Sequence, residues 1–250
     1  MLPFIMLILA LVCGITWYKE PRIFLLIFHR MAFPIRKGNP LHIDKELNFP
    51  GSLRLEKNWL LLFMELKAVL DRSKPLPKFH EVDRANYKIS FEDGPAWRTL
   101  VLKAYDGWFA DNCKMFPQTC KLLSDLSDVS TVMFSILEPH VKIPEHTGKF
   151  SGIWRYHLAL QVPAAGLCFI EVNGEKYFWK EGEGILFNDT YLHSVNNDTD
   201  GYRIILFLDI TKRSSKFVRA INKCILYLIK ESPIFKKATN HTHCLFLWPF

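Results

Sequence analysis

The stretch from Gly152 to Ile210 most constrains how this chain can fold, because its polar and apolar residues alternate as they do in β-strands. Along IWRYHLALQV, one face carries Arg155, His157, Ala159 and Gln161, and the other carries Trp154, Tyr156, Leu158, Leu160 and Val162. A strand face with a histidine beside an arginine meets either bulk water or a lined pocket. The many aromatic residues nearby favour the pocket.

The rest of this stretch also reads as sheet. Asn173-Gly174 is a strong signal for a tight hairpin turn. Further along lie two glycines, a histidine and an asparagine, at Gly182, Gly184, His193 and Asn197. Their spacing is typical of a small double-stranded β-helix barrel, around the strand that delivers a second metal-binding histidine. Arg203 then begins an apolar run to Ile210, and a guanidinium in such a strand needs an anionic partner.

The N-terminal residues predict a membrane anchor. Residues 1–18 contain no charged side chain and are about long enough to cross a bilayer as a helix. A signal peptide is disfavoured because no basic segment precedes the apolar run and no small-residue cleavage site follows it. Five cations lie just beyond the run, at Lys19, Arg22, Arg30, Arg36 and Lys37, so the positive-inside rule predicts a single-pass protein of the inner membrane with its body in the cytoplasm.

The remaining chain divides into three parts. Residues 19–50 form a basic juxtamembrane segment, and residues 51–212 form the barrel domain with helices before it. One helix is expected from Ser52, its N-cap, through Leu66. Residues 213–250 are basic and amphipathic, which fits a helix lying on an anionic membrane or one packed on the barrel with a cationic face exposed.

Charge and cysteine content narrow the possible partners. The net charge of +7 argues for an acidic partner, and we expect no nucleic acid because no nucleic-acid motif is present. The six cysteines lack zinc-finger or CxxC spacing, so free thiols are expected, with a Cys113–Cys120 disulfide as the open alternative.

Two segments, EHTGKFSGIWRYHLAL and FNDTYLHSVNNDTDGYRIILFLDI, resemble the aspartyl/asparaginyl β-hydroxylase family of Fe(II)/2-oxoglutarate dioxygenases. The similarity is greatest to its membrane-anchored lipid A hydroxylase branch and runs from about residue 58 to 210. The resemblance implies that His157 and His193 hold Fe(II), and that Arg203 pairs with the distal carboxylate of 2-oxoglutarate. It also places His146 and Arg155 near this co-substrate, with O2 as the second one.

One position departs from the usual iron site of such oxygenases. A carboxylate ordinarily follows the first histidine by two residues, and Ala159 stands there instead. The site therefore has either two protein ligands plus water or a carboxylate from elsewhere. Asp189 is the candidate, and we expect it to orient His193 or a bound water rather than bind the metal. Trp154, Gln161 and Asn197 are the further residues expected to contact the ligands or the substrate.

The predicted fold is mainly β with flanking helices, a jelly-roll, cupin-like barrel after an N-terminal transmembrane helix. The resemblance predicts an Fe(II)/2-oxoglutarate dioxygenase that hydroxylates an acyl chain of an anionic membrane lipid, with lipid A as the first candidate and the same membrane as its binding surface. The alternatives are hydroxylation of Asp or Asn side chains in peptides, and a non-catalytic cupin-like binding protein.

Overall fold

The computed structural model describes residues 39–72, 76–79, 95–148, 150–163 and 167–213, and the separate helical residues 220, 222, 223, 226, 227 and 231. The predicted anchor, residues 1–18, lies outside these residues, as does most of the juxtamembrane segment. Within the described part of the chain, no helix combines the length and the apolarity needed to cross a membrane.

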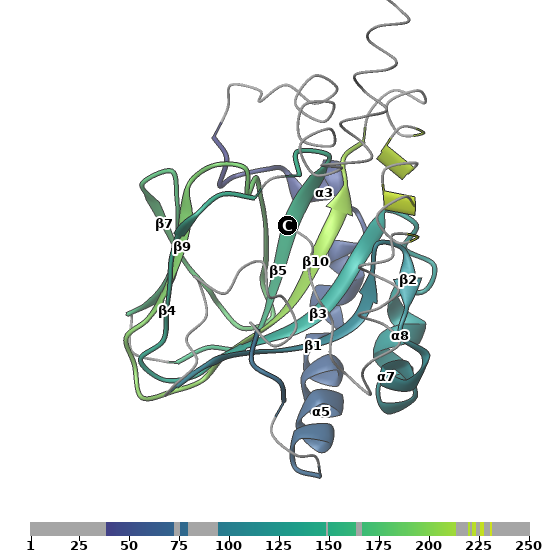
Figure 1. The fold of residues 1–250 in the computed structure, drawn as a ribbon, viewed down its shortest axis with the longest axis horizontal. Coiled ribbons are helices and arrows are strands. Elements are labelled where there is room, and N and C mark those ends of the chain that lie inside the picture. Colours follow the sequence, from purple (N-terminus) through teal and green to yellow (C-terminus); the bar gives the residue numbers. More distant parts are fainter. Residues whose placement is uncertain are drawn as a thin grey trace, which may run out of the picture.

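The described strands form two antiparallel sheets that face each other (Figure 1). The six-stranded sheet has the order β2 (Gly107–Trp108), β1 (Trp97–Ala104), β3 (Val129–Leu137), β10 (Arg203–Thr211), β5 (Ile153–Gln161), β8 (Gly184–Phe187). The four-stranded sheet has the order β4 (Lys142–His146), β9 (His193–Asn197), β6 (Cys168–Val172), β7 (Glu175–Phe178). This arrangement confirms the prediction of a mainly β fold with flanking helices.

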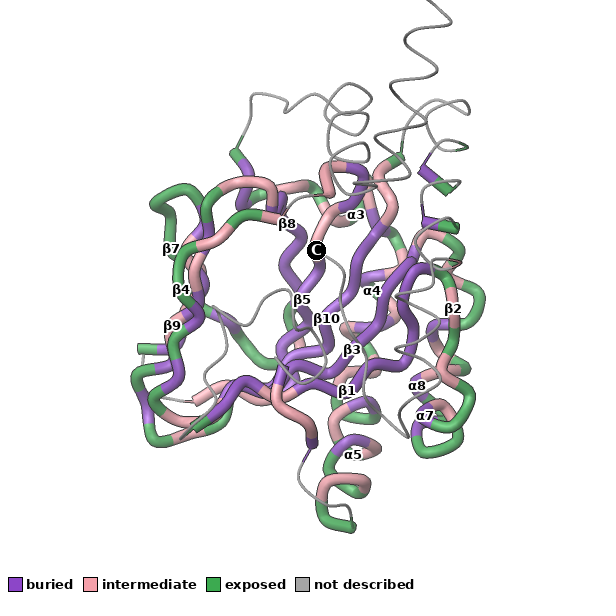
Figure 2. The backbone as a smooth tube through the Cα atoms, viewed as in Figure 1, coloured by how far each residue is buried: buried purple, intermediate pink, exposed green. Residues whose placement is uncertain are grey.

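Strand alternation gives the six-stranded sheet two buried faces. Its inner face packs against the four-stranded sheet through residues such as Ala159, Ile205 and Phe207. Its outer face, with Leu158 and Leu206, packs against the helices. These helices are α3 (Lys45–Asn48), α4 (Ser52–Lys57), α5 (Trp59–Leu70), α7 (Ala110–Met115) and α8 (Pro117–Leu123). Figure 2 shows the result, with the central strands buried and the exposed residues on helices, loops and the edge strands β4 and β7.

The helix predicted from Ser52 onward is two helices, so that prediction was wrong in detail. Asn58, with φ −110° and ψ 14°, separates α4 from α5. Its side-chain amide donates to the carbonyl of Arg54 at 2.8 Å and so competes with the helical hydrogen bond to that carbonyl. Ser52 is the buried first residue of α4 rather than its N-cap, which is Gly51.

The predicted turn between β6 and β7 is confirmed. Asn173 and Gly174 have φ of 52° and 83°, the positive values that a two-residue hairpin turn of this kind requires. Cys113, Cys120 and Cys168 are free thiols, so the alternative of a Cys113–Cys120 disulfide was wrong.

The described C-terminal residues pack on the barrel. Leu226 belongs to the inner hydrophobic core, and the buried Asn222 donates a hydrogen bond to the carbonyl of Gly152 at 3.0 Å. Lys223 and Tyr227, one residue further in each case, are exposed. At these positions the structure favours the packed alternative over a helix lying only on a membrane.

Candidate active site

A small cavity of about 30 Å³ lies between the two sheets, and its polar lining is unusual for a barrel core. The polar side chains that line it come from five strands and comprise Ser135, His146, Arg155, His157, His193 and Arg203. This volume is little more than that of one water-sized group, and the cavity is partly open to solvent.

His157 projects inward from the middle of β5, opposite Phe207 on β10 and Ile185 on β8. Both of its ring nitrogens are buried and have no hydrogen-bond partner within the described structure. Burial, followed by the charges of Arg203 and Arg155, holds the pKa of His157 well below its usual value. The ring is therefore neutral and keeps a lone pair, and a buried polar ring without a partner is costly unless a ligand satisfies it.

His193 comes from the opposite sheet, at the start of β9. Its Nδ1 lies 2.9 Å from the carbonyl oxygen of Tyr191 and donates to it, which leaves Nε2 as the nitrogen with the lone pair. Burial and the neighbouring His146 lower its pKa to about 4. The rings of His146 and His193 lie 4.1 Å apart, and Nδ1 of His146 donates to the carbonyl of Pro144 at 2.8 Å.

Arg203 is a fully buried cation at the start of β10, with 1% of its surface exposed. Its guanidinium lies over the ring of Trp179 and donates to Oγ of Ser135 at 3.2 Å, while its Nε has no hydrogen-bond partner. No carboxylate among the described residues forms an ion pair with it, and burial lowers its pKa to about 10. Such a charge is costly unless an anion joins it.

Arg155 has the opposite situation, because two buried carboxylates compensate its charge. Its guanidinium lies 3.0 Å from Asp189 and 3.1 Å from Asp209. Burial lowers the pKa of Arg155, but these two carboxylates outweigh that effect and leave the pKa above its ordinary value. These ion pairs hold Asp189 and Asp209 close to Arg155, which itself lines the cavity, and the expected contact of Arg155 with a co-substrate stays a prediction.

Gly148 packs directly against this ion-pair group. Its backbone N–H donates to the carbonyl of Asp189 at 2.7 Å. A Cβ atom at this position would lie 2.0 Å from Oδ2 of Asp189, far inside contact distance. Only glycine fits here without displacing that carboxylate.

Comparison with known proteins supports the resemblance drawn from the sequence. The sequence profile described as aspartyl/asparaginyl beta-hydroxylase matches residues 56–213, a range that includes every residue lining the small cavity. The chain belongs to the aspartyl/asparaginyl beta-hydroxylase family.

Two relatives and one solved structure illustrate the range of similarity. An ornithine lipid ester-linked acyl 2-hydroxylase of Rhizobium tropici is 31% identical over 205 residues, which are 82% of this chain and 72% of that protein. The human aspartyl/asparaginyl beta-hydroxylase is 29% identical over 180 residues, 70% of this chain but 23% of that protein. A crystal structure of a 2OG-Fe(II) oxygenase-family oxidoreductase from Burkholderia pseudomallei has a TM-score of 0.38 at 14% identity, over 47% of this chain and 66% of that one.

The residues of this hydroxylase-family member fit a metal ion with two protein ligands. His157 and His193 are neutral, line one cavity from opposite sheets and keep lone pairs. Within the described residues, no group of three or more His, Cys, Asp or Glu side chains could hold a metal. The buried Ala159 offers no ligand, and Asp189 is engaged with Arg155 through one oxygen, while its Oδ1 has no hydrogen-bond partner.

Three of the predicted residues are not at the site. Trp154 lies on the helix-covered face of β5, where the ammonium group of Lys212 sits 3.7 Å from its ring centre. Gln161 is at the far end of β5 and donates to the carbonyl of Tyr202. Asn197 is fully buried, and its side-chain amide donates hydrogen bonds to the backbone carbonyls of Glu138 and Gly201 at 2.9 Å each. None of the three lines the small cavity, and their expected contact with the ligands or the substrate stays a prediction.

Sequence reasoning also missed residues that the structure places at the site. Asp209 could have been found, since it follows Arg203 on the same face of β10 by a period of two. Ser135 lies within a β3 strand that is buried throughout, so only the pairing of β3 with β10 identifies it. Trp179 and Gly148 lie outside the strands, and no local pattern marks them.

Proposed function

We propose that this protein is an Fe(II)/2-oxoglutarate-dependent dioxygenase that hydroxylates an acyl chain of a membrane lipid. One observation supports it above the others: Arg203 is a buried cation that pairs with no carboxylate of the described residues, in the same cavity as two neutral histidines with free lone pairs. Burying a cation and two imidazole rings without partners lowers the stability of the fold, so a barrel used only as a scaffold would gain nothing from them.

Each group has a distinct task in this proposal. His157 and His193 hold Fe(II), and bound Fe(II) with O2 and 2-oxoglutarate supplies the oxidising power for an unactivated C–H bond. Arg203 binds the distal carboxylate of 2-oxoglutarate, oriented by Ser135 and Trp179. Arg155 keeps Asp189 near His193. The Asp189 carboxylate acts to raise the pKa of His193. Phe187 and Phe207 pack against His157 and exclude water from the ring.

The substrate class follows from the relatives and from charge. The Rhizobium tropici relative, whose alignment covers most of both chains, acts on an ester-linked acyl chain of a lipid. A net charge of +7 favours an anionic membrane as substrate source and binding surface. Lipid A remains the substrate candidate from the sequence resemblance, and lipids with an amino acid headgroup are a second candidate, from the Rhizobium tropici relative. The accompanying location is the inner membrane, with one N-terminal span and the barrel in the cytoplasm.

Peptide hydroxylation is the second candidate, because the human relative is an aspartyl/asparaginyl hydroxylase. One experiment separates the candidates. The full-length protein is incubated with Fe(II), 2-oxoglutarate and either a bacterial lipid extract or an Asp- and Asn-containing peptide library, with the His157→Ala variant as control. We expect succinate formation and one added oxygen atom on a lipid acyl chain, both lost in the variant. Oxygen on peptides alone would reject the lipid substrate, and absence of succinate under all conditions would reject the enzyme.

A further inference from the structure

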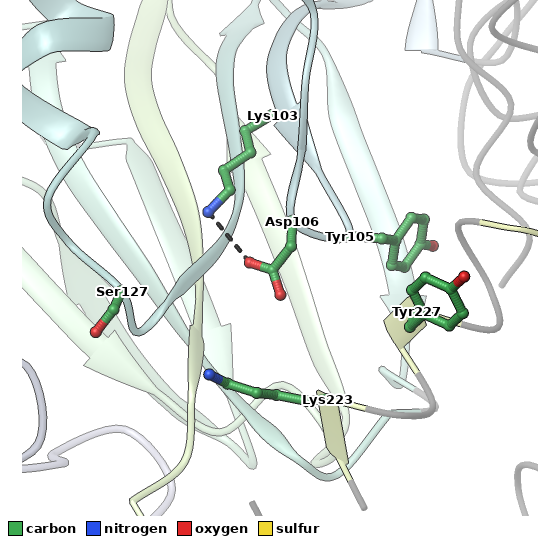
Figure 3. Close-up of a pocket in the computed structure, with 6 residues that line it drawn as sticks. All are labelled: Lys103, Tyr105, Asp106, Ser127, Lys223 and Tyr227. Carbon is green, nitrogen blue, oxygen red and sulfur yellow. Dashed lines mark ion pairs between the residues drawn. The ribbon is translucent and has the colours of Figure 1, made fainter. Parts of the chain in front are cut away.

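A second and larger cavity, of about 390 Å³, lies between the β1–β2 turn and the C-terminal helical residues (Figure 3). It is lined by Lys103, Tyr105, Asp106, Ser127, Lys223 and Tyr227. Its volume is within the range of small-molecule sites. None of these residues belongs to the proposed metal or 2-oxoglutarate site.

This cavity shares a wall with the active site. Tyr105 lines the larger cavity and is part of the inner hydrophobic core. The N–H of the neighbouring Asp106 donates to the carbonyl of Ser130 on β3 at 3.0 Å. The next residue, Thr131, pairs across the sheet with Asp209, whose carboxylate lies 3.1 Å from Arg155 of the smaller cavity. The core residue Leu226 fixes the adjacent C-terminal residues at the other side of the larger cavity. A molecule bound there would be separated from the smaller cavity by Tyr105 and by the ion-pair group of Arg155, Asp189 and Asp209.

The charges of the cavity leave one cation uncompensated. The buried ammonium group of Lys103 forms an ion pair with Asp106 at 3.1 Å and donates to the carbonyl of Val129. Lys223 has no ion pair with any described residue, and Figure 3 shows its ammonium group extending into the cavity. The Ser127 hydroxyl and the rings of Tyr105 and Tyr227 complete a lining suited to an anionic group attached to carbon chains.

We propose that this cavity binds the anionic headgroup of the lipid substrate, with Lys223 pairing with its phosphate or carboxylate and Ser127 donating a hydrogen bond. The proposal rests on the function proposed above and specifies the substrate end that the protein recognises. Because the cavity adjoins the active site, the carbon that is hydroxylated lies near the headgroup end of the acyl chain.

The test compares Lys223→Glu with Lys67→Glu in the full-length protein. Lys67 is exposed on α5, so both variants change the net charge equally. With a phosphate-bearing lipid in mixed micelles, we expect Lys223→Glu to raise KM for the lipid about tenfold or more. The values of kcat and of KM for 2-oxoglutarate stay unchanged, because no metal or co-substrate contact is altered. Ser127→Ala should raise KM for the lipid by a smaller factor. Equal KM in both Lys→Glu variants would overturn the proposal.

A binding experiment keeps this test separate from the proposed reaction. Binding of inorganic phosphate and of a short-chain phosphate-bearing lipid is measured by calorimetry on both variants and the unchanged protein, without Fe(II) or 2-oxoglutarate. Lipid binding weakened by Lys223→Glu alone supports the headgroup site even if no turnover is found. Binding of free phosphate but not of lipid, or equal lipid binding by both variants, overturns it.

Discussion

Replacing Arg155 with methionine tests the buried ion-pair group at its centre. In the folded protein, the Arg155 side chain is 16% exposed, and those of Asp189 and Asp209 are 2% and 3% exposed. Arg155→Met removes the charge and leaves two carboxylates buried side by side. Breaking a buried ion pair in this way costs about 3–5 kcal/mol, which lowers the thermal midpoint by about 6–20 °C in a domain of this size.

The stability loss caused by Arg155→Met should also depend on pH, which gives a second and independent check. Burial already raises the pKa of Asp209, and removing Arg155 takes away a charge that lowers it. A carboxyl whose pKa is higher in the folded than in the unfolded state stabilises the fold while it is protonated, and this stabilisation is lost as the pH rises through the folded pKa. The destabilisation of Arg155→Met should therefore be larger near pH 8 than near pH 5.

Urea unfolding at both pH values measures the effect, with Arg54→Met as the matched control. Arg54 pairs with Asp125 on the surface, where both side chains are more than a third exposed, so its loss should change the stability little. Adding Asp209→Asn to Arg155→Met should restore part of the stability. An Arg155→Met variant no less stable than the control, or one whose loss is the same at both pH values, would refute the reasoning.

Four further substitutions test the metal, co-substrate and carboxylate contacts. His157→Ala and His193→Ala should each abolish iron binding, and a folded variant that retained one iron per chain by metal analysis would reject the assignment. Arg203→Met should raise KM for 2-oxoglutarate by about 10- to 150-fold, as expected for losing ~1.5–3 kcal/mol of charge-assisted hydrogen bonding. Its iron content should be unchanged, and an unaltered KM would exclude the carboxylate contact. Gly148→Ala should lower turnover by displacing Asp189, and turnover equal to that of the unchanged protein would show that this carboxylate can move without cost.

The residues that were predictable from the sequence are those whose role depends on strand alternation. His157 and Arg203 lie where the alternation placed them, on inner faces of β5 and β10. The same alternation places Trp154 on the opposite face of β5, and the structure confirms that face, where Trp154 packs with the outer core. The backbone hydrogen bonds of Asn197 were not predictable, because a buried polar residue near a histidine can serve either a ligand or the chain's own carbonyls.

Other features depend on contacts between distant segments, which no local pattern reveals. The pairing of Arg155 with Asp189 joins β5 to the loop before β9, and the fit of Gly148 against Asp189 depends on the same loop. The split at Asn58 was hidden because apolar residues continue at helical spacing on both sides of it. The larger cavity requires the C-terminal residues to fold back over the β1–β2 turn.

The position of β10 in the sheet has a consequence for synthesis on the ribosome. Among the described residues this strand is the last in sequence, yet it lies between β3 and β5 and pairs with both. Until it emerges, each of those strands has an unpaired hydrophobic edge, the kind of surface that promotes aggregation. Without β10, the six-stranded sheet divides into the strand groups β2-β1-β3 and β5-β8, so the two groups can join through β10 only after residues 203–211 have left the ribosome.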